Sequence, residues 1–166
     1  MRILKENAFI IGGATFLLVL WLSGPRVAIN TSESLPIGIY FITQTSGKEV
    51  GKGDLVLFYD EEINKKAAER KYIREGHMIG KRVAAVGGEN IRVGPKQTTL
   101  SGIPVSGKAP RTDSKGRPMQ RFLYNGVVPD GTVFLLGDTD NSYDSRYYGF
   151  VEISKITGTL TPLFIW

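Results

Sequence analysis

Ser34 is the first of three features whose residue types and spacing could do chemistry. It lies in the stretch Ser-Leu-Pro-Ile-Gly, where Pro36 favours an extended conformation for the residue before it and Gly38 allows a sharp change of direction. A serine hydroxyl is a weak nucleophile until a neighbouring base removes its proton. Held in one orientation beside such a base, Ser34 could attack a carbonyl carbon. Taken alone, the stretch also fits a linker, because several hydroxyl residues cluster there.

The candidate base is Lys81, which stands shortly before the small apolar residues 83–86 of a predicted buried strand. Burial disfavours the charged form of a lysine and lowers its pKa, which is what a lysine base requires. The alternative is a lysine on an edge strand whose ammonium group reaches water. The chain has no cysteine, which excludes a thiolate nucleophile or thiolate metal site. The single histidine, His77, is predicted to be a surface or strand-end residue.

The third feature is the polar loop at residues 137–149, which is rich in aspartate and serine. Its Asp-x-Asp spacing suggests calcium, but an EF-hand loop counted from Asp138 would need Gly at its sixth position and Glu at its twelfth, and neither is there. We therefore predict no metal ion and no cofactor. A charge-assisted pair between Asp144 and Arg146 that braces a turn fits the loop better. Ser142 could then hydrogen-bond the lysine amine and orient it.

A mainly antiparallel β-fold is predicted to position these residues, because 20 glycines and 8 prolines separate many short β-branched and aromatic runs. The predicted strands are residues 26–30, 39–42, 55–59, 77–86, 90–93, 98–100, 103–105, 132–136, 150–151 and 156–160, with residues 163–166 as a last strand in preference to a lipid contact. One short surface helix, polar on most faces and capped by Asp60, is predicted over residues 61–74. Residues 106–119 are predicted to form a mobile surface loop.

Residues 1–24 are predicted to be a cytoplasmic tail and a transmembrane signal anchor, followed by a β-rich domain over residues 25–166. Residues 8–22 contain no charged residue. A helix over them and the next serine would be about 24 Å long against a hydrocarbon core of about 30 Å, so the span is short. A cleaved signal peptide and a buried core helix are the alternatives, but no Ala-x-Ala cleavage site follows.

The charges around the apolar segment predict its orientation. Arg2 and Lys5 before the segment outnumber Arg26 after it, which places the N-terminus in the cytoplasm, the anchor in the cytoplasmic membrane as a single pass, and the β-rich domain outside. Ten residues separate Gly24 from Ser34, and they span at most about 33–36 Å when fully extended. The serine is therefore expected close to the bilayer surface.

The net charge of +5 leaves two kinds of partner to compare. The basic residues are scattered, and no RNA-binding or helix-turn-helix signature accompanies them, so no nucleic acid is expected. Anionic lipid headgroups fit such a distribution at least as well. We expect a lipid bilayer and a membrane-associated precursor protein as the partners.

Together, the three features resemble the type I signal peptidase superfamily, and most closely its conjugative-transfer peptidase branch (TraF type). The resemblance covers nearly the whole chain in order: an apolar N-terminus, Ser-Leu-Pro-x-Gly, Lys-Arg-Val, and Gly-Asp through Ser-x-Asp-Ser-Arg-x-x-Gly. It implies a signal-peptidase-like antiparallel β-fold with Ser34 as nucleophile and Lys81 as general base. It implies an oxyanion hole formed by the Ser34 amide and the hydroxyl of Ser32. It further implies that Ser142 orients the lysine.

The resemblance also implies structural support from Asp138, Asp144 and Arg146. Signal peptidases in general carry Ser-Met-x-Pro, whereas here proline follows after one residue, which points to the specialised branch. The implied activity is serine endopeptidase processing of secreted or pilin-type precursors for conjugative transfer, by hydrolysis or with cyclisation of the product.

Two other functions compete with this interpretation. One is a non-catalytic, membrane-tethered β-domain that binds partners in a secretion or pilus assembly. The other is a soluble, self-cleaving repressor-type peptidase with the same serine and lysine. The apolar N-terminal segment counts against the second, because that class carries a DNA-binding domain there.

Overall fold

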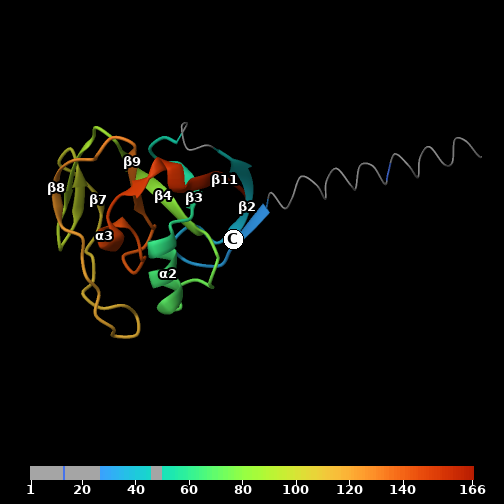
Figure 1. Cartoon of the computed structure of the whole chain (residues 1–166), viewed down its shortest axis with the longest axis horizontal. Helices are drawn as coiled ribbons and strands as arrows, with labels where there is room; N and C mark the ends of the chain where they lie inside the picture. Colours follow the sequence, from blue (N-terminus) through green and yellow to red (C-terminus); the bar gives the residue numbers. More distant parts are fainter. Residues whose placement is uncertain (1–12, 14–26, 46–49) are drawn as a thin grey trace, which may run out of the picture.

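A computed structural model describes residue 13, residues 27–45 and residues 50–166 (Figure 1). The predicted anchor at residues 1–24 lies outside the described residues, apart from Gly13. Within the described part of the chain, no helix combines the length and the apolar character needed to cross a bilayer.

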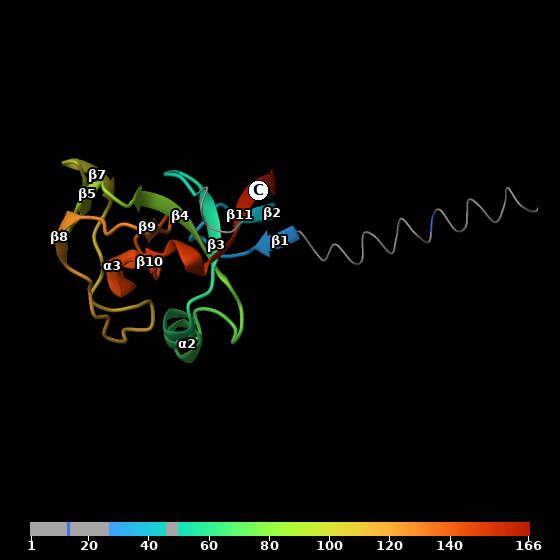
Figure 2. The same ribbon diagram turned by 45° about the horizontal axis from the view of Figure 1, so that its top comes forward.

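The described domain is built on two antiparallel sheets, which confirms the predicted fold class. The larger sheet has the order β1-β2-β11-β3-β4-β9-β10 and the smaller has the order β7-β6-β5-β8. The larger sheet comprises β1 Val27–Asn30, β2 Gly38–Gln44, β3 Leu55–Phe58, β4 Ile79–Val86, β9 Thr132–Leu136, β10 Val151–Glu152 and β11 Ile156–Ile165; the smaller comprises β5 Asn90–Val93, β6 Thr98–Leu100, β7 Ile103–Ser106 and β8 Tyr124–Val127. Figure 2 shows β1, β2 and the C-terminus at one end of the domain and the smaller sheet at the other.

Strand β4 is the element that matters most for the site. It lies between β3 and β9, so it is an interior strand of the sheet and not an edge. Its residues alternate between buried and half-buried, and Lys81 falls on the buried side with Ile79, Val83 and Ala85. Successive residues of a strand point to opposite faces of the sheet. Lys81 therefore points to the same face as Ile79, Val83 and Ala85, which is the face that packs in the core. The edge-strand interpretation of Lys81 is therefore wrong.

Helix α2, Glu61–Glu69, is the predicted surface helix, but it ends before residue 74. Asp60 caps its start by accepting hydrogen bonds from the amides of the second and third helical residues. At its end Lys71 takes a left-handed conformation with φ of 58°, and its amide and that of Tyr72 donate back to Ala68 and Ala67. This pattern closes a helix and usually uses glycine. No glycine stands at this position, which explains why the sequence predicted a helix that continues to residue 74.

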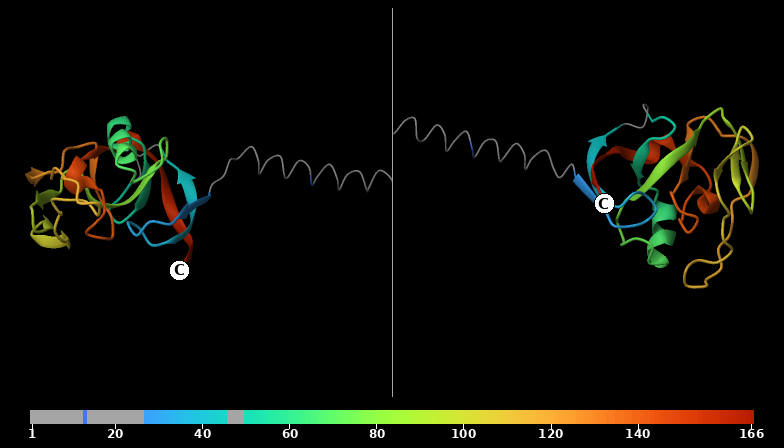
Figure 3. Two further views of the ribbon diagram at one scale, coloured as in Figure 1. Left: turned by 90° about the horizontal axis from the view of Figure 1, so that it is seen from below. Right: turned by 180° about the vertical axis from the view of Figure 1, so that it is seen from behind.

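Three further elements differ from the sequence-based expectation. Strand β8 and helix α3, Ser145–Tyr148, were not predicted, and neither was the 3-10 turn η1, Ile153–Lys155. Strand β11 runs on to Ile165, which agrees with the predicted last strand, and the backbone amide of Trp166 donates to the carbonyl of Ile37 at 3.2 Å. Figure 3 shows this end of β11 beside β2.

The predicted mobile loop at residues 106–119 is held by Asp113. Its carboxylate accepts hydrogen bonds from the amides of Lys115 and Arg117, from the Arg117 side chain at 2.7 Å and from the Tyr72 hydroxyl at 2.7 Å. The guanidinium of Arg70 lies 3.6 Å away. Tyr72 and Arg70 are remote in sequence, so local composition carries no sign of these contacts.

Candidate active site

The loop that carries Ser34 runs from β1 to β2 and is organised by Asn30. The Asn30 side-chain oxygen accepts hydrogen bonds from the Ser32 amide and hydroxyl, at 3.1 and 2.9 Å. Its side-chain nitrogen donates to the carbonyls of Ser32, Leu35 and Pro36 at 2.8–3.0 Å. An asparagine that bonds the backbone two residues on is a local turn former. The Asn-x-Ser spacing at residues 30–32 is the sequence signal for this role.

Ser34 is half-buried and is tied to the polar loop through its backbone. Its carbonyl accepts a hydrogen bond of 2.8 Å from the amide of Asp138. The next residue, Leu35, is buried in a small cluster with Tyr40 and Leu160. The backbone of Ser34 is thus held from both sides. A serine in such a loop keeps one orientation, and the loop does not have to become ordered when a substrate binds.

Lys81 lines the same cavity as Ser34, a space of about 640 Å³. Its side chain is only 4% exposed. Burial lowers the pKa of its ammonium group to about 8; Asp144 and Asp138 oppose this shift, and Arg146 adds to it. The amine is therefore neutral in a much larger fraction of molecules than an exposed lysine would be.

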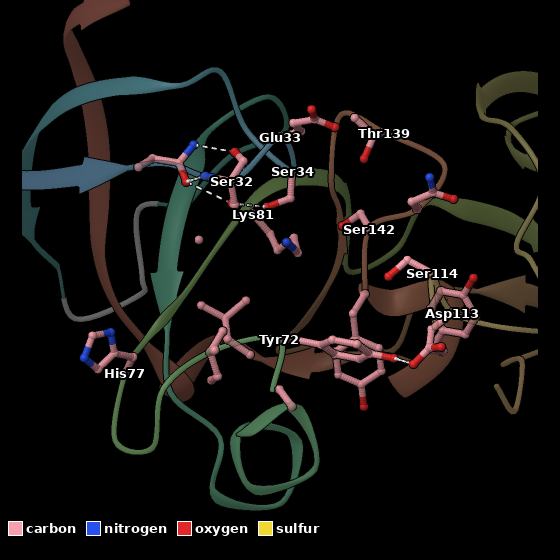
Figure 4. Close-up of a pocket in the computed structure, with 18 of the residues that line it drawn as sticks. Ser32, Glu33, Ser34, Tyr72, His77, Lys81, Asp113, Ser114, Thr139 and Ser142 are labelled. Atoms are coloured by element: carbon pink, nitrogen blue, oxygen red, sulfur yellow. Dashed lines mark hydrogen bonds between the residues drawn. The ribbon is translucent and has the colours of Figure 1, made fainter. Parts of the chain in front are cut away.

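Figure 4 shows Ser34, Lys81 and Ser142 grouped at one side of this cavity. No hydrogen bond joins the Lys81 amine to another described residue, Ser34 included. Catalytic hydrogen bonds are often long without substrate and shorten in the reacting complex. What the arrangement provides is a serine and a desolvated amine in one space.

Ser142 is buried beside this pair. Its hydroxyl has no hydrogen-bond partner among the described residues. An unpaired buried hydroxyl is costly unless a group of the site uses it. The backbone of Gly137 packs against it so closely that a Cβ there would overlap the Ser142 oxygen. The sequence therefore needs glycine at position 137 for Ser142 to face the cavity.

Asp144 and Arg146 form a fully buried ion pair behind Ser142, with side chains 0% and 1% exposed. Two parallel hydrogen bonds of 2.8 and 2.7 Å join the guanidinium and the carboxylate. Asp144 also accepts a hydrogen bond of 3.0 Å from the Gly137 amide, and Arg146 donates to the carbonyls of Lys108 and Thr139. The pair therefore holds both ends of the polar loop.

Asp138 supports the loop through a different partner. Its carboxylate accepts two hydrogen bonds from Arg82, at 3.0 and 2.9 Å. Arg82 is adjacent to Lys81 on β4, so this bridge joins the loop to the strand that carries the amine. Nothing local in the sequence marks Arg82 for this role, because the two residues are far apart in the chain.

The two predicted oxyanion donors, the Ser34 amide and the Ser32 hydroxyl, differ in their hydrogen bonds. The backbone amide of Ser34 has no hydrogen-bond acceptor among the described residues, so it is free to bind an oxyanion. The hydroxyl of Ser32 donates to Asn30 and lies 3.0 Å from the Ser34 hydroxyl oxygen. A hydroxyl has one hydrogen to donate. Ser32 must therefore turn away from Asn30 before it can donate to an oxyanion.

A serine and a buried lysine thus line one cavity of a mainly antiparallel β-fold. The chain belongs to the family described as signal peptidase, peptidase S26, whose sequence pattern matches residues 1–166.

The chain is also similar to individual proteins. The chain is 33% identical over 181 residues to a plasmid transfer protein TraF from Escherichia coli, covering 99% of both chains. It is 32% identical to a conjugal transfer protein TraF from Agrobacterium fabrum, covering 99% of this chain and 94% of the relative. A crystal structure of a signal peptidase I from Enterococcus faecalis is 28% identical, with a TM-score of 0.43 over 69% of this chain and 98% of that one.

Proposed function

We propose that the protein is a membrane-anchored serine endopeptidase that uses Ser34 as nucleophile and Lys81 as general base. The observation that carries this proposal is the lysine itself. Lys81 is 4% exposed on an interior strand, its pKa is lowered to about 8, and its amine faces the cavity that Ser34 lines. A structural lysine gains nothing from such a position, because burial without a direct ion pair destabilises its charged form.

The reaction follows from these placements. Neutral Lys81 accepts the hydroxyl proton of Ser34 while the serine oxygen bonds to the carbonyl carbon of the scissile peptide. The Ser34 amide stabilises the oxyanion that forms. When the carbon–nitrogen bond breaks, the protonated lysine gives its proton to the leaving amine and an acyl-enzyme remains. We expect the unpaired hydroxyl of Ser142 to hydrogen-bond the lysine amine and orient it toward Ser34.

The acyl-enzyme has two possible acceptors. Water gives hydrolysis, whereas an amine of the precursor itself gives a cyclised product. The relatives named above are plasmid and conjugal transfer proteins. We therefore propose a secreted or pilin-type precursor for conjugative transfer as the substrate. We place residues 1–24 in the cytoplasmic membrane as a single-pass anchor, with the domain outside.

The Ser34→Ala variant tests this proposal directly. With the full-length protein and a membrane-embedded precursor in the same vesicles, mass spectrometry of the products should show cleavage by the unaltered protein and none by the variant. Ser154→Ala, at an exposed serine that bonds Glu152, is the matched control and should cleave normally. Cleavage that survives Ser34→Ala would leave the non-catalytic binding domain as the better account.

The pH dependence of cleavage tests the role of Lys81. Since the neutral amine is the active form and its pKa is about 8, the rate should rise about tenfold per pH unit up to about pH 7 and level off above 8. Initial rates from pH 6 to 10 measure this profile. A rise of the rate with pH that disappears in His77→Gln would assign the base to the histidine instead.

A further inference from the structure

One wall of the active-site cavity is built from three tyrosines. Tyr72 follows helix α2, whereas Tyr143 and Tyr147 belong to the polar loop and helix α3, and all three line the cavity that holds Ser34 and Lys81. The rings of Tyr72 and Tyr143 lie 5.3 Å apart, and the stacked rings of Tyr143 and Tyr147 lie 6.0 Å apart. Figure 4 shows Tyr72 across the cavity from Ser34. We call these three residues the tyrosine wall.

The tyrosine wall is not packed as a core cluster is packed. Tyr72 and Tyr143 rest against the core on one side, but all three side chains stay half-buried. Tyr143 and Tyr147 also line a second cavity, of about 650 Å³, which α2 lines too. Protein interiors rarely hold spaces of this size, whereas ligand sites are concave and lined by aromatic side chains. Burial raises the pKa of all three tyrosines, so the wall is uncharged at neutral pH.

Asp113 fixes the orientation of Tyr72 in this wall. Its carboxylate is only 6% exposed and accepts a hydrogen bond of 2.7 Å from the Tyr72 hydroxyl. The same carboxylate accepts a hydrogen bond of 2.7 Å from Arg117, whose guanidinium lies over the Tyr72 ring, 5.5 Å from its centroid. The hydroxyl and one face of the ring are thus both held, and Tyr72 keeps one position.

We propose that the tyrosine wall is a subsite that selects an aromatic side chain of the precursor, and that Asp113 positions Tyr72 for it. The inference rests on the proposed function, because a precursor whose scissile bond lies at Ser34 places its neighbouring side chains in the same cavity. Aromatic rings pair favourably with one another, and Met119 adds a thioether to this cavity that packs well on rings. The carboxylate of Asp113 already pairs with Arg117, so a charged side chain would lose water at this wall without gaining an ion pair.

Competition between two precursors tests the subsite in the full-length protein. One carries phenylalanine and the other alanine, at each position flanking the scissile bond in turn. The ratio of their cleavage rates should favour phenylalanine on the order of tenfold at one position, and Tyr72→Ala should remove this preference. Both precursors compete for the same enzyme molecules, so the ratio does not depend on how much of a variant folds. Tyr59→Ala, at a 41% exposed tyrosine outside the cavity, is the matched control and should keep the preference.

The same ratio tests the positioning role of Asp113. Asp113→Ala removes the acceptor of the Tyr72 hydroxyl and should lower the preference for phenylalanine. Asp113→Asn retains an oxygen that can accept this hydrogen bond and should restore most of the preference. A merely structural defect would slow cleavage of both precursors alike, so an unchanged ratio in Asp113→Ala would overturn the positioning role.

Cross-linking separates the subsite from the proposed function. Precursors with the photoreactive residue benzoylphenylalanine at the same positions, irradiated with the Ser34→Ala protein, should give cross-links to the tyrosine wall in mass spectra of the digested protein. Such cross-links, in a protein whose unaltered form cleaves no precursor, would reject the proposed function and leave the subsite standing. Cleavage without a preference for phenylalanine, or with one that Tyr72→Ala keeps, would overturn the subsite and leave the peptidase standing. Neither cleavage nor cross-links would overturn both.

Discussion

Replacing Lys81 by methionine should stop precursor cleavage and at the same time make the folded protein more stable. Methionine keeps much of the length of the side chain without its charge. The pKa of Lys81 falls from 10.5 to about 8 on folding, mainly through burial. At 1.36 kcal/mol per unit, holding the charged amine in the folded protein at pH 7 costs on the order of 3 kcal/mol. The free energy of unfolding should rise by about that amount, while cleavage falls by at least about 10⁴-fold.

The sign of the pH dependence makes this prediction specific. Between pH 8 and 10.5 the unfolded chain binds more protons at Lys81 than the folded protein does, so the unaltered protein gains stability as the pH rises through this window. The methionine variant lacks this gain, and the difference between the two proteins should shrink. Unfolding measured in the same detergent from pH 7 to 10.5 would show it. Lys65→Met, at an exposed lysine on α2, is the control and should change neither stability nor cleavage.

A Lys81→Met protein that is inactive and less stable would give the opposite answer. It would mean that the ammonium group is compensated in the fold by Asp144 and Asp138. The lysine would then have a structural role, and the proposal of a neutral base would fail.

Removing either partner of the Asp144–Arg146 pair should destabilise the protein by about 3–5 kcal/mol. Arg146→Ala leaves the buried Asp144 carboxylate unpaired, and Asp144→Ala leaves the buried Arg146 guanidinium only the exposed Asp140, at 3.6 Å. Asp144→Ala also removes the acceptor of the Gly137 amide, and Arg146→Ala leaves the Lys108 and Thr139 carbonyls without that donor. The double variant should be less destabilised than the sum of the two single variants, since it leaves no unpaired charge. Denaturant unfolding of the four proteins measures this coupling.

The Arg82–Asp138 bridge supplies a matched control for this cycle. It has the same two-bond geometry, but its side chains are 39% and 33% exposed. Exposed pairs contribute about 0–1 kcal/mol, so Arg82→Ala should cost far less than Arg146→Ala. An equal loss of unfolding free energy in Arg82→Ala and Arg146→Ala would show that the burial of Arg146 is not what makes its ion pair important for stability.

Much of the fold was readable because its signals are local. Strands β5, β6 and β9 have the predicted bounds, since glycine and proline breaks and short β-branched runs mark them in the sequence. The Asp60 cap follows from the residue itself. Helix α3 was missed because a four-residue helix inside a polar loop has no periodic pattern to detect. The end of α2 was misplaced because Lys71, not glycine, adopts the left-handed conformation that ends it.

By itself, the sequence predicted the strand that carries Lys81, the pairing of Asp144 with Arg146 and the order of the features that resemble the signal peptidases. It left Ser34 open as a linker residue and Lys81 open as an edge lysine. Only the tertiary structure decided that β4 lies between β3 and β9, so that the lysine loses its water, and that Asn30 and Asp138 bring the serine loop to the same cavity. The physical reason is range: turns and caps depend on neighbours in the chain, whereas desolvation depends on every segment packed around one atom.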